Sequence, residues 1–195
     1  MTRTRKNTTK VNNKTRTYKR DDYNSNDGML TSVWGPPLWH VLHSMSFNYP
    51  VNPSKFERQH YRDFILSLKW TLPCGKCRTN LVNNLKSLPV EIKHMKSRDT
   101  FSRYVYDLHE VVNTMLKKKS GLSYEDIRER YEHFRARCTE SVKEHDKRIK
   151  KEIETGCVEP LYGKKSKCIL KIIPDEEKCE SIQIDDKCIK KSTID

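Results

Sequence analysis

Between residues 34 and 138, apolar side chains recur every three or four positions, which is the period of an amphipathic helix. The pattern predicts helices over 37–47, 56–71, 99–117 and 124–137, with a further short helix after Cys77. Asp99 and Ser123 stand where N-caps are expected. Because this region contains no convincing strand, we predict an all-α fold, a small bundle of four to five helices.

Composition limits how much of the chain this bundle can include. Of the 195 residues, 34% are hydrophobic and 33% are charged, and the mean hydropathy is −0.90, so we do not expect the whole length to pack into one globule. The sequence offers neither a membrane-spanning run nor the apolar region of a secretory signal. We expect a tail over 1–30, one domain over 31–138, and an extension over 139–195.

The formal net charge of +13 is concentrated at the N-terminus, because residues 1–20 hold eight basic residues and no acidic one. This segment has very few apolar side chains to bury, so we expect it to be disordered. Two roles stay open for it. It either contacts nucleic acid or an anionic surface non-specifically, or it is a solvated leader without a binding role.

Two of the seven cysteines form a Cys-x-x-Cys pair, Cys74 and Cys77. That spacing allows both sulfurs to lie at the first turn of a helix, where backbone N–H groups stabilise a thiolate. Pro73 precedes the pair, as expected at a helix start, and Lys76 and Arg78 would add positive charge. Redox chemistry is one interpretation, and an ordinary buried or metal-bound pair is the other. The other cysteines have spacings wider than a zinc site usually shows, which disfavours zinc.

Two predicted helices carry a second face that packing does not require. Trp39 and His43 are one helical turn apart, and His109 and Asn113 repeat that spacing ahead of Lys117 and Lys118. Such faces suit a planar ligand that bears phosphate. The simpler alternative for each pair is a core residue beside a histidine whose hydrogen bonds are satisfied.

Four segments together carry a resemblance to a known family. These are the run from Trp34 to His43 (WGPPLWHVLH), Tyr49-Pro50, the run from Pro73 to Cys77 (PCGKC), and the run from His109 to Asn113 (HEVVN). In order and spacing this chain closely resembles the Erv/ALR family of FAD-linked sulfhydryl oxidases. Its WGPPLW form is similar to that of members encoded by large DNA viruses.

The resemblance implies an FAD-dependent thiol oxidase that forms disulfides in protein substrates and passes the electrons to oxygen, giving hydrogen peroxide. It implies that Cys77 is the flavin-proximal cysteine and that Cys74 exchanges with the incoming thiol. It also implies a set of residues that hold FAD, namely Trp34, Trp39, His43, Tyr49, Tyr106, His109, Val112, Asn113, Lys117, Lys118, Arg130 and Tyr131. A homodimer through the first helices is a further implication.

The sequence departs from the family pattern at several places. Tyr131 stands where the family's Arg-Trp pair has tryptophan. Glu110 replaces an asparagine of the usual HNxVN motif. Cys138 has no cysteine near Tyr124 to form the structural disulfide of the cellular members, so it is free, intermolecular or paired with the extension.

The extension begins with a charged stretch over 141–154, which we predict to be helical, followed by β-favouring runs at Ile169–Ile173 and Ile182–Ile184. Its cysteines Cys157, Cys168, Cys179 and Cys188 have three possible roles: structural disulfides, a shuttle pair that relays electrons to Cys74, or a metal site.

We therefore expect an FAD-linked thiol oxidase that acts on protein thiols, with no metal site, in the host cytoplasm or the virion. The main rival is a non-enzymatic, basic helical protein that binds nucleic acid or a virion partner, with a structural or zinc-bound cysteine pair. A thioredoxin-like reductase is disfavoured, because the sequence lacks a βαβ pattern.

Overall fold

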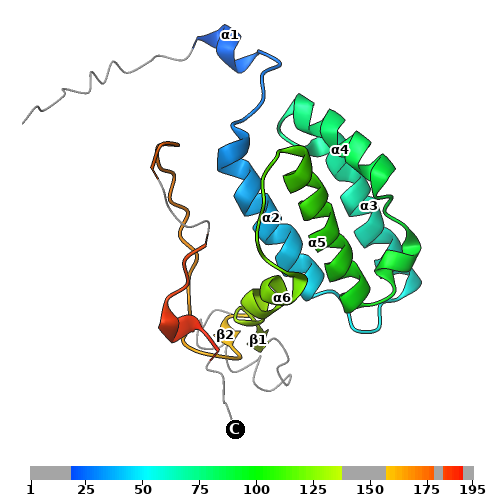
Figure 1. Cartoon of the computed structure of the whole chain (residues 1–195), viewed down its shortest axis with the longest axis vertical. Coiled ribbons are helices and arrows are strands. Elements are labelled where there is room, and N and C mark those ends of the chain that lie inside the picture. The colour runs from blue at the N-terminus through cyan, green and yellow to red at the C-terminus, as the bar shows by residue number, and fades with distance from the viewer. Residues whose placement is uncertain (1–18, 138–156, 178–181, 191–195) are drawn as a thin grey trace, which may run out of the picture.

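The computed structural model describes residues 19–137, 157–177 and 182–190. The α-helices are α1 (Arg20–Tyr23), α2 (Thr31–Phe47), α3 (Lys55–Thr71), α4 (Gly75–Ser87), α5 (Arg98–Met115) and α6 (Tyr124–Glu132), with 3₁₀ turns η1 (Ile92–Met95) and η2 (Asp186–Cys188). Strands β1 (Ala136–Arg137) and β2 (Glu159–Pro160) pair antiparallel, with Ala136 opposite Pro160. Helices α2 to α5 lie side by side and α6 crosses one end of them, as Figure 1 shows. The predicted all-α fold is confirmed.

Serine caps begin three of the bundle helices. The side chains of three serines accept the backbone N–H of the residue three positions ahead, and the serine backbone N–H donates to that residue's side chain. These serines are Ser54, Ser97 and Ser123. The predicted cap at Ser123 is confirmed. The cap predicted at Asp99 is wrong, because Ser97 with Thr100 forms the capping box and leaves Asp99 in the first turn.

Helix α2 begins six residues before the predicted start and contains Pro36 and Pro37. Both prolines lie in its second turn, where each lacks the backbone N–H that would bond the carbonyl four residues earlier. Helix α6 ends at Glu132, not near residue 137, because the chain turns there to pair β1 with β2.

Two clusters of buried side chains hold the bundle together. The larger contains Leu42, Tyr49, Ile65, Leu68, Leu81, Val90, Met95, Phe101, Tyr104, Val105 and Leu108. The smaller, between α2 and α6, contains Phe47, Tyr124 and Tyr131, with Tyr106 and Ile127 packed against it. The larger cluster joins α2 to α5, so the site residues on these two helices have a fixed mutual position.

Two arginines tie down the C-terminal end of α2. Arg135 donates to the Phe47 carbonyl at 3.2 Å and to the Asn48 side chain at 3.2 Å, and it pairs with Glu132. Arg98 donates to the Tyr49 carbonyl at 2.7 Å. The last carbonyls of a helix lack intrahelical partners, so Arg135 satisfies that of Phe47, while Arg98 bonds the chain just beyond the helix.

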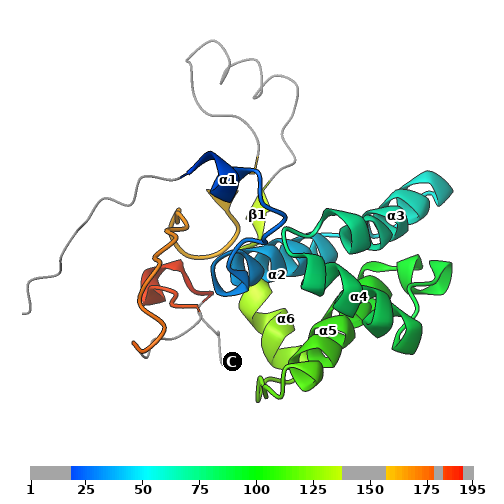
Figure 2. The same ribbon diagram turned by 90° about the horizontal axis from the view of Figure 1, so that it is seen from above.

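The C-terminal extension contacts the bundle near β1. Besides the β1–β2 pairing, Leu161 N–H donates to the Arg135 carbonyl at 2.7 Å, and Lys190 N–H donates to His133 Nδ1 at 3.1 Å. From this base the segment extends on the α2 side of the bundle, away from α3 and α4 (Figures 1 and 2). The β-favouring runs predicted at Ile169–Ile173 and Ile182–Ile184 form no strand.

The described cysteines of the extension differ in state. Cys157 is disulfide-bonded, whereas Cys168 and Cys188 are free thiols. Residues 1–18 of the predicted tail and the charged stretch predicted to be helical at 141–154 lie outside the described residues. Within the described part, no helix is both long and apolar enough to span a membrane.

Candidate functional site

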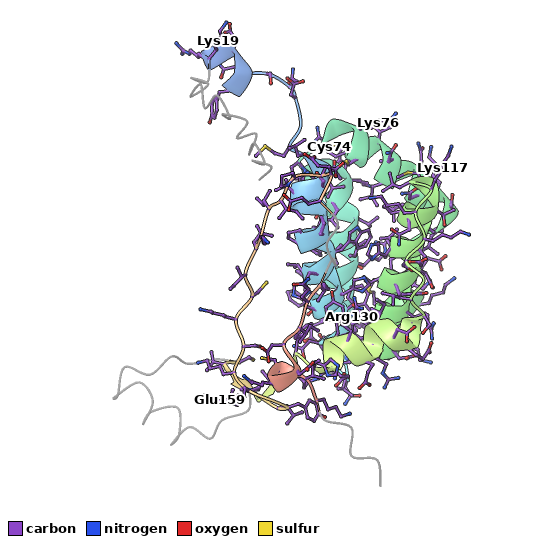
Figure 3. The ribbon with its side chains drawn as sticks, turned by 60° about the vertical axis from the view of Figure 1, so that its left-hand side comes forward. Lys19, Cys74, Lys76, Lys117, Arg130 and Glu159 are labelled. Atoms are coloured by element: carbon purple, nitrogen blue, oxygen red, sulfur yellow. The ribbon has the colours of Figure 1, made fainter. Side chains whose placement is uncertain are left out.

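The two cysteines of the Cys-x-x-Cys pair lie at the start of α4, at one end of the bundle (Figure 3). Cys74 is the N-cap, and its Sγ accepts the backbone N–H of Cys77 at 3.3 Å. Both are partly exposed free thiols. The predicted position of the pair at a helix start is therefore confirmed.

The pKa values of the two thiols move in opposite directions. The pKa of Cys74 is lowered, because Sγ accepts hydrogen bonds from the Cys77 side chain and backbone. Burial raises the pKa of Cys77, and its hydrogen bond to Cys74 adds to that. Cys74 therefore ionises first, which suits the more accessible partner in thiol–disulfide exchange.

The segment that precedes α2 packs directly on this pair. Met29 N–H donates to the Pro73 carbonyl at 2.9 Å, and a Cβ on Gly28 would lie 3.0 Å from Cys74 Cα. The Thr31 hydroxyl lies 3.6 Å from Cys77 Sγ. Trp34, expected to contact the cofactor, donates its indole N–H to the Met29 carbonyl at 3.0 Å and so holds this segment in place.

The two basic residues of the motif occupy different surroundings. Lys76 is exposed at the end of the bundle that bears Cys74 (Figure 3). The guanidinium of Arg78 donates to the Leu72 carbonyl at 2.6 Å, which ties α4 to the end of α3.

A cluster of rings lies between α2, α5 and α6. Trp39 stacks on His109 with centroids 3.9 Å apart and planes 7° from parallel. His43 Nε2 and His109 Nδ1 share a hydrogen bond at 3.0 Å, and the ring of His43 is 5.4 Å from that of Tyr131. The structure thus brings together four of the predicted cofactor residues, and we call Trp39, His43, His109 and Tyr131 the ring cluster.

Both histidines of the ring cluster are neutral at pH 7. The pKa of His43 falls to about 3, because of burial first and then repulsion from His109 and His40. Burial lowers the pKa of His109 to about 4. Although His43 is only 3% exposed, its Nδ1 has no hydrogen-bond partner among the described residues. Such an atom is costly to bury unless a further group binds it.

The C-terminal half of α5 carries the remaining predicted contacts on that helix. Asn113 donates to Glu110 at 2.8 Å, so the glutamate that departs from the family motif engages the neighbouring motif residue. Val112 is half-buried, and the Tyr106 hydroxyl donates to the Leu122 carbonyl at 2.9 Å. Beyond the helix, Lys117 and Lys118 are exposed, and Lys117 has a φ of 56°.

Two further members of the predicted cofactor set are Tyr49 and Arg130. Tyr49 is fully buried in the larger core cluster, and its hydroxyl donates to the Met95 carbonyl at 2.8 Å. Arg130, on α6, lies toward the opposite end of the bundle from Lys117, as Figure 3 shows. The structure therefore divides the predicted set instead of gathering it around one point.

Sequence reasoning missed two contacts. His40 Nδ1 lies 3.1 Å from the Tyr131 hydroxyl, and its place three residues before His43 on one helix was the available signal. Thr31 contacts a residue 46 positions away, so no local pattern could have indicated it.

Among the residues that the structure describes, no group of three or more His, Cys, Asp and Glu side chains could hold a metal ion.

Comparison with known proteins finds a family model and several viral relatives. Residues 36–132 match the model described as the Erv1 / Alr family. Over 91 residues the chain is 34% identical to a probable FAD-linked sulfhydryl oxidase of Acanthamoeba polyphaga mimivirus, covering 47% of this chain and 64% of that relative. A putative FAD-linked sulfhydryl oxidase of Invertebrate iridescent virus 6 is 29% identical over 90 residues, covering 44% and 81%.

Among solved structures, the crystal structure of the yeast Erv1 core is similar, with 21% identity, a TM-score of 0.48, and coverage of 62% of this chain and 95% of that one. The chain thus spans less than two thirds of the length of its mimivirus relative. The matched range 36–132 contains both the cysteine pair and the ring cluster.

Proposed function

This chain carries a domain of the Erv1/Alr family, and from that premise we propose that it is an FAD-linked thiol oxidase that forms disulfides in protein substrates. The observation that carries the proposal is the position of the thiol pair. Cys74 caps α4 with a lowered pKa, and Cys77 lies one turn into the helix against the start of α2. A pair of this kind can open and close as a disulfide.

Helix α2 connects this pair to the ring cluster. Thr31 at its start contacts Cys77, and Trp39 stacks on His109 eight residues further along, which is about 12 Å in a helix. A cofactor that joins a redox-active ring to a second aromatic ring through phosphates suits such a spacing.

The described residues fit FAD. The unpartnered Nδ1 of His43 can bond a ring nitrogen or oxygen, and Trp39 offers a face for stacking. Because His43 and His109 are neutral, they place no charge beside an aromatic ring. Lys117 and Lys118 supply cations suited to a pyrophosphate. When bound, FAD would take an electron pair from the cysteine dithiol and transfer it to oxygen, giving hydrogen peroxide.

Two predicted residues act differently in this proposal. The hydroxyl of Tyr49 is already satisfied by the Met95 carbonyl of η1, so we assign Tyr49 to fixing the end of α2 in the core. Trp34 orients the segment over the cysteines through its bond to Met29.

The chain's own residues perform the exchange with substrate. A substrate thiolate attacks Cys74 Sγ of the Cys74–Cys77 disulfide, forms a mixed disulfide, and releases Cys77 as a thiolate. A second substrate thiolate then attacks the substrate sulfur of the mixed disulfide and releases Cys74. The substrate gains one disulfide, and the enzyme holds two electrons as a dithiol. The lowered pKa of Cys74 favours its departure in the second step.

Purified protein provides the test. We expect flavin absorbance at about one FAD per chain, and oxygen uptake with a stoichiometric yield of peroxide when a dithiol is added. A colourless protein that takes up no oxygen after incubation with FAD would contradict the proposal and favour a basic binding protein.

The remaining partners are part of the same proposal. Oxygen is the acceptor, and a homodimer forms through the first helices, where Val41 of α2 is 48% exposed. Sedimentation of the holoprotein tests the dimer, and a monomer would exclude it. Action in the host cytoplasm or the virion, and weak contact of the basic tail with anionic surfaces, stay predictions.

A further inference from the structure

Thr31 is the first residue of α2, and its hydroxyl reaches across to the start of α4. Thr31 Oγ1 lies 3.6 Å from Cys77 Sγ, within the range of a hydrogen bond to sulfur. The side chain of Cys77 otherwise interacts with Cys74 of its own helix. The hydroxyl therefore supplies Cys77 Sγ with a hydrogen-bonding contact from outside α4.

Several contacts hold Thr31 at this position. Gly28 passes so close to Cys74 that an added Cβ would lie 3.0 Å from Cys74 Cα and 3.1 Å from the Pro73 carbonyl oxygen. The backbone bond from Met29 to Pro73 fixes the chain at 2.9 Å, and the bond from Trp34 to Met29 closes the turn at 3.0 Å. A segment tied at three points presents its hydroxyl in one place, which is what preorganisation requires.

We propose that Thr31 is a positioning residue of the thiol pair, donating its hydroxyl hydrogen to the Cys77 thiolate as that thiolate is released. The proposal rests on the exchange at Cys74 described above. Attack of a substrate thiolate on Cys74 Sγ breaks the sulfur–sulfur bond, and the bonding pair leaves on Cys77 Sγ. No proton is transferred, and the hydroxyl hydrogen is shared with the new anion.

The energetic reason lies in the leaving group. Disulfide exchange is faster when the departing thiol has a lower pKa. Burial and the neighbouring Cys74 raise the pKa of Cys77, whereas the Thr31 hydroxyl lowers it. Thr31 thus opposes the burial that would otherwise slow release of Cys77. Because the hydroxyl is exposed, water competes for it and the expected effect is modest.

The test uses Thr31→Val, which removes the hydroxyl but keeps the side-chain shape, and Thr31→Ser, which keeps the hydroxyl. Ser32→Ala, at the next exposed residue of α2, is the matched control. In a Cys74→Ser background, the rate at which iodoacetamide modifies Cys77 is followed against pH by mass spectrometry of its peptide. In the intact disulfide form, anaerobic reduction of Cys74–Cys77 by dithiothreitol is timed.

We expect Thr31→Val to slow Cys77 modification at pH 7.5 by up to about threefold, and disulfide reduction by somewhat less, as a rise of roughly half a pKa unit requires. Thr31→Ser should restore both rates, and Ser32→Ala should leave them unchanged. Equal pH profiles for wild type and Thr31→Val would overturn the proposal. Equal slowing by valine and serine would do so too, because the hydroxyl would not be the cause. Both readouts measure thiols without flavin turnover, so failure of the oxidase proposal would appear separately, as absent oxygen uptake.

Discussion

The helical bundle and the C-terminal extension are stabilised in different ways. In the bundle, large side chains such as Tyr49, Ile65 and Phe101 are almost fully buried, and serine caps begin three helices. In the extension, Ile169, Leu170 and Ile172 are all more than 60% exposed. Its contacts are mostly backbone bonds near its base, such as that from Lys164 to Lys187 at 2.8 Å.

This difference explains why the proposed chemistry lies in the bundle. A thiol pair and a ring cluster need fixed positions. Packing of α2 against α5 fixes the ring cluster, and the contacts of the segment before α2 fix the thiol pair. The extension carries cysteines as well, but the described ones, Cys157, Cys168 and Cys188, lie outside both clusters of buried side chains. Each prediction below changes one residue of the bundle, and the first two match it with a residue of the extension.

The largest difference is expected between the cysteines of the two regions. Cys77→Ser should abolish dithiol oxidation while bound FAD is retained, because the bond that accepts the electron pair is lost. Cys168→Ser, at an exposed free thiol of the extension, should oxidise dithiothreitol at the wild-type rate. Oxygen electrode traces and flavin spectra of both variants check this. Turnover by Cys77→Ser would refute its assigned role.

Two isoleucines, one in each region, should differ almost as clearly in how much they contribute to the free energy of unfolding. Ile65 is 1% exposed in the bundle and Ile169 is 76% exposed in the extension. Ile65→Ala should lower the free energy of unfolding by about 3 kcal/mol, because it leaves a cavity. Ile169→Ala should change it by less than about 0.5 kcal/mol. Urea unfolding followed by circular dichroism gives both values, and comparable losses would show that the extension has a core of its own.

Acid should destabilise the bundle through His43. The unfolded histidine takes up a proton below a pKa of about 6.5, whereas the folded one does so only near 3. The contribution of this pKa difference to the free energy of unfolding is therefore complete above pH 6.5 and is lost as the pH falls toward 3. At pH 5 the loss is about 2 kcal/mol.

Unfolding free energies at pH 7 and pH 5 measure this loss. His43→Gln should show a smaller drop, whereas His60→Gln, at an exposed position of α3, should keep the wild-type drop. An unchanged drop in His43→Gln would mean that other groups cause the acid sensitivity.

The smallest expected change concerns the residue after α5. Lys117 adopts a φ of 56°, a left-handed conformation that glycine adopts without strain. Lys117→Gly should stabilise the apoprotein by about 1 kcal/mol while weakening FAD binding, if the lysine holds a phosphate. Lys119→Gly, in the exposed loop beyond it, should give no stabilisation. Thermal melts of the apoproteins and FAD titrations measure the two effects, and tighter binding by Lys117→Gly would exclude the phosphate role.

Periodicity predicted the bundle helices well because each of them buries a stripe of apolar residues, as Tyr104, Val105 and Leu108 do on α5. It placed the start of α2 too late, since the first turns of that helix contain glycine and two prolines. It placed the cap of α5 at Asp99. Ser97 is the cap, because its backbone N–H donates to the Thr100 hydroxyl and its side chain accepts the Thr100 N–H.

For the site, helical spacing correctly put Trp39 with His43 and His109 with Asn113 on shared faces. Which faces meet depends on tertiary packing, and so the stack of Trp39 on His109 appears only in the folded chain. The cofactor role predicted for Tyr49 rests on resemblance alone, and the bond of its hydroxyl to the Met95 carbonyl is a tertiary contact that no local pattern indicates.

The clamp made by Arg135 affects where the functional unit ends. The family match stops at residue 132, yet Arg135 satisfies the end of α2, 88 positions earlier in the chain. A fragment cut at residue 132 would leave the Phe47 carbonyl without this donor, at the end of the helix that carries Trp39 and His43. A fragment that is to keep this bond must therefore extend through Arg135, three residues beyond the end of the family match.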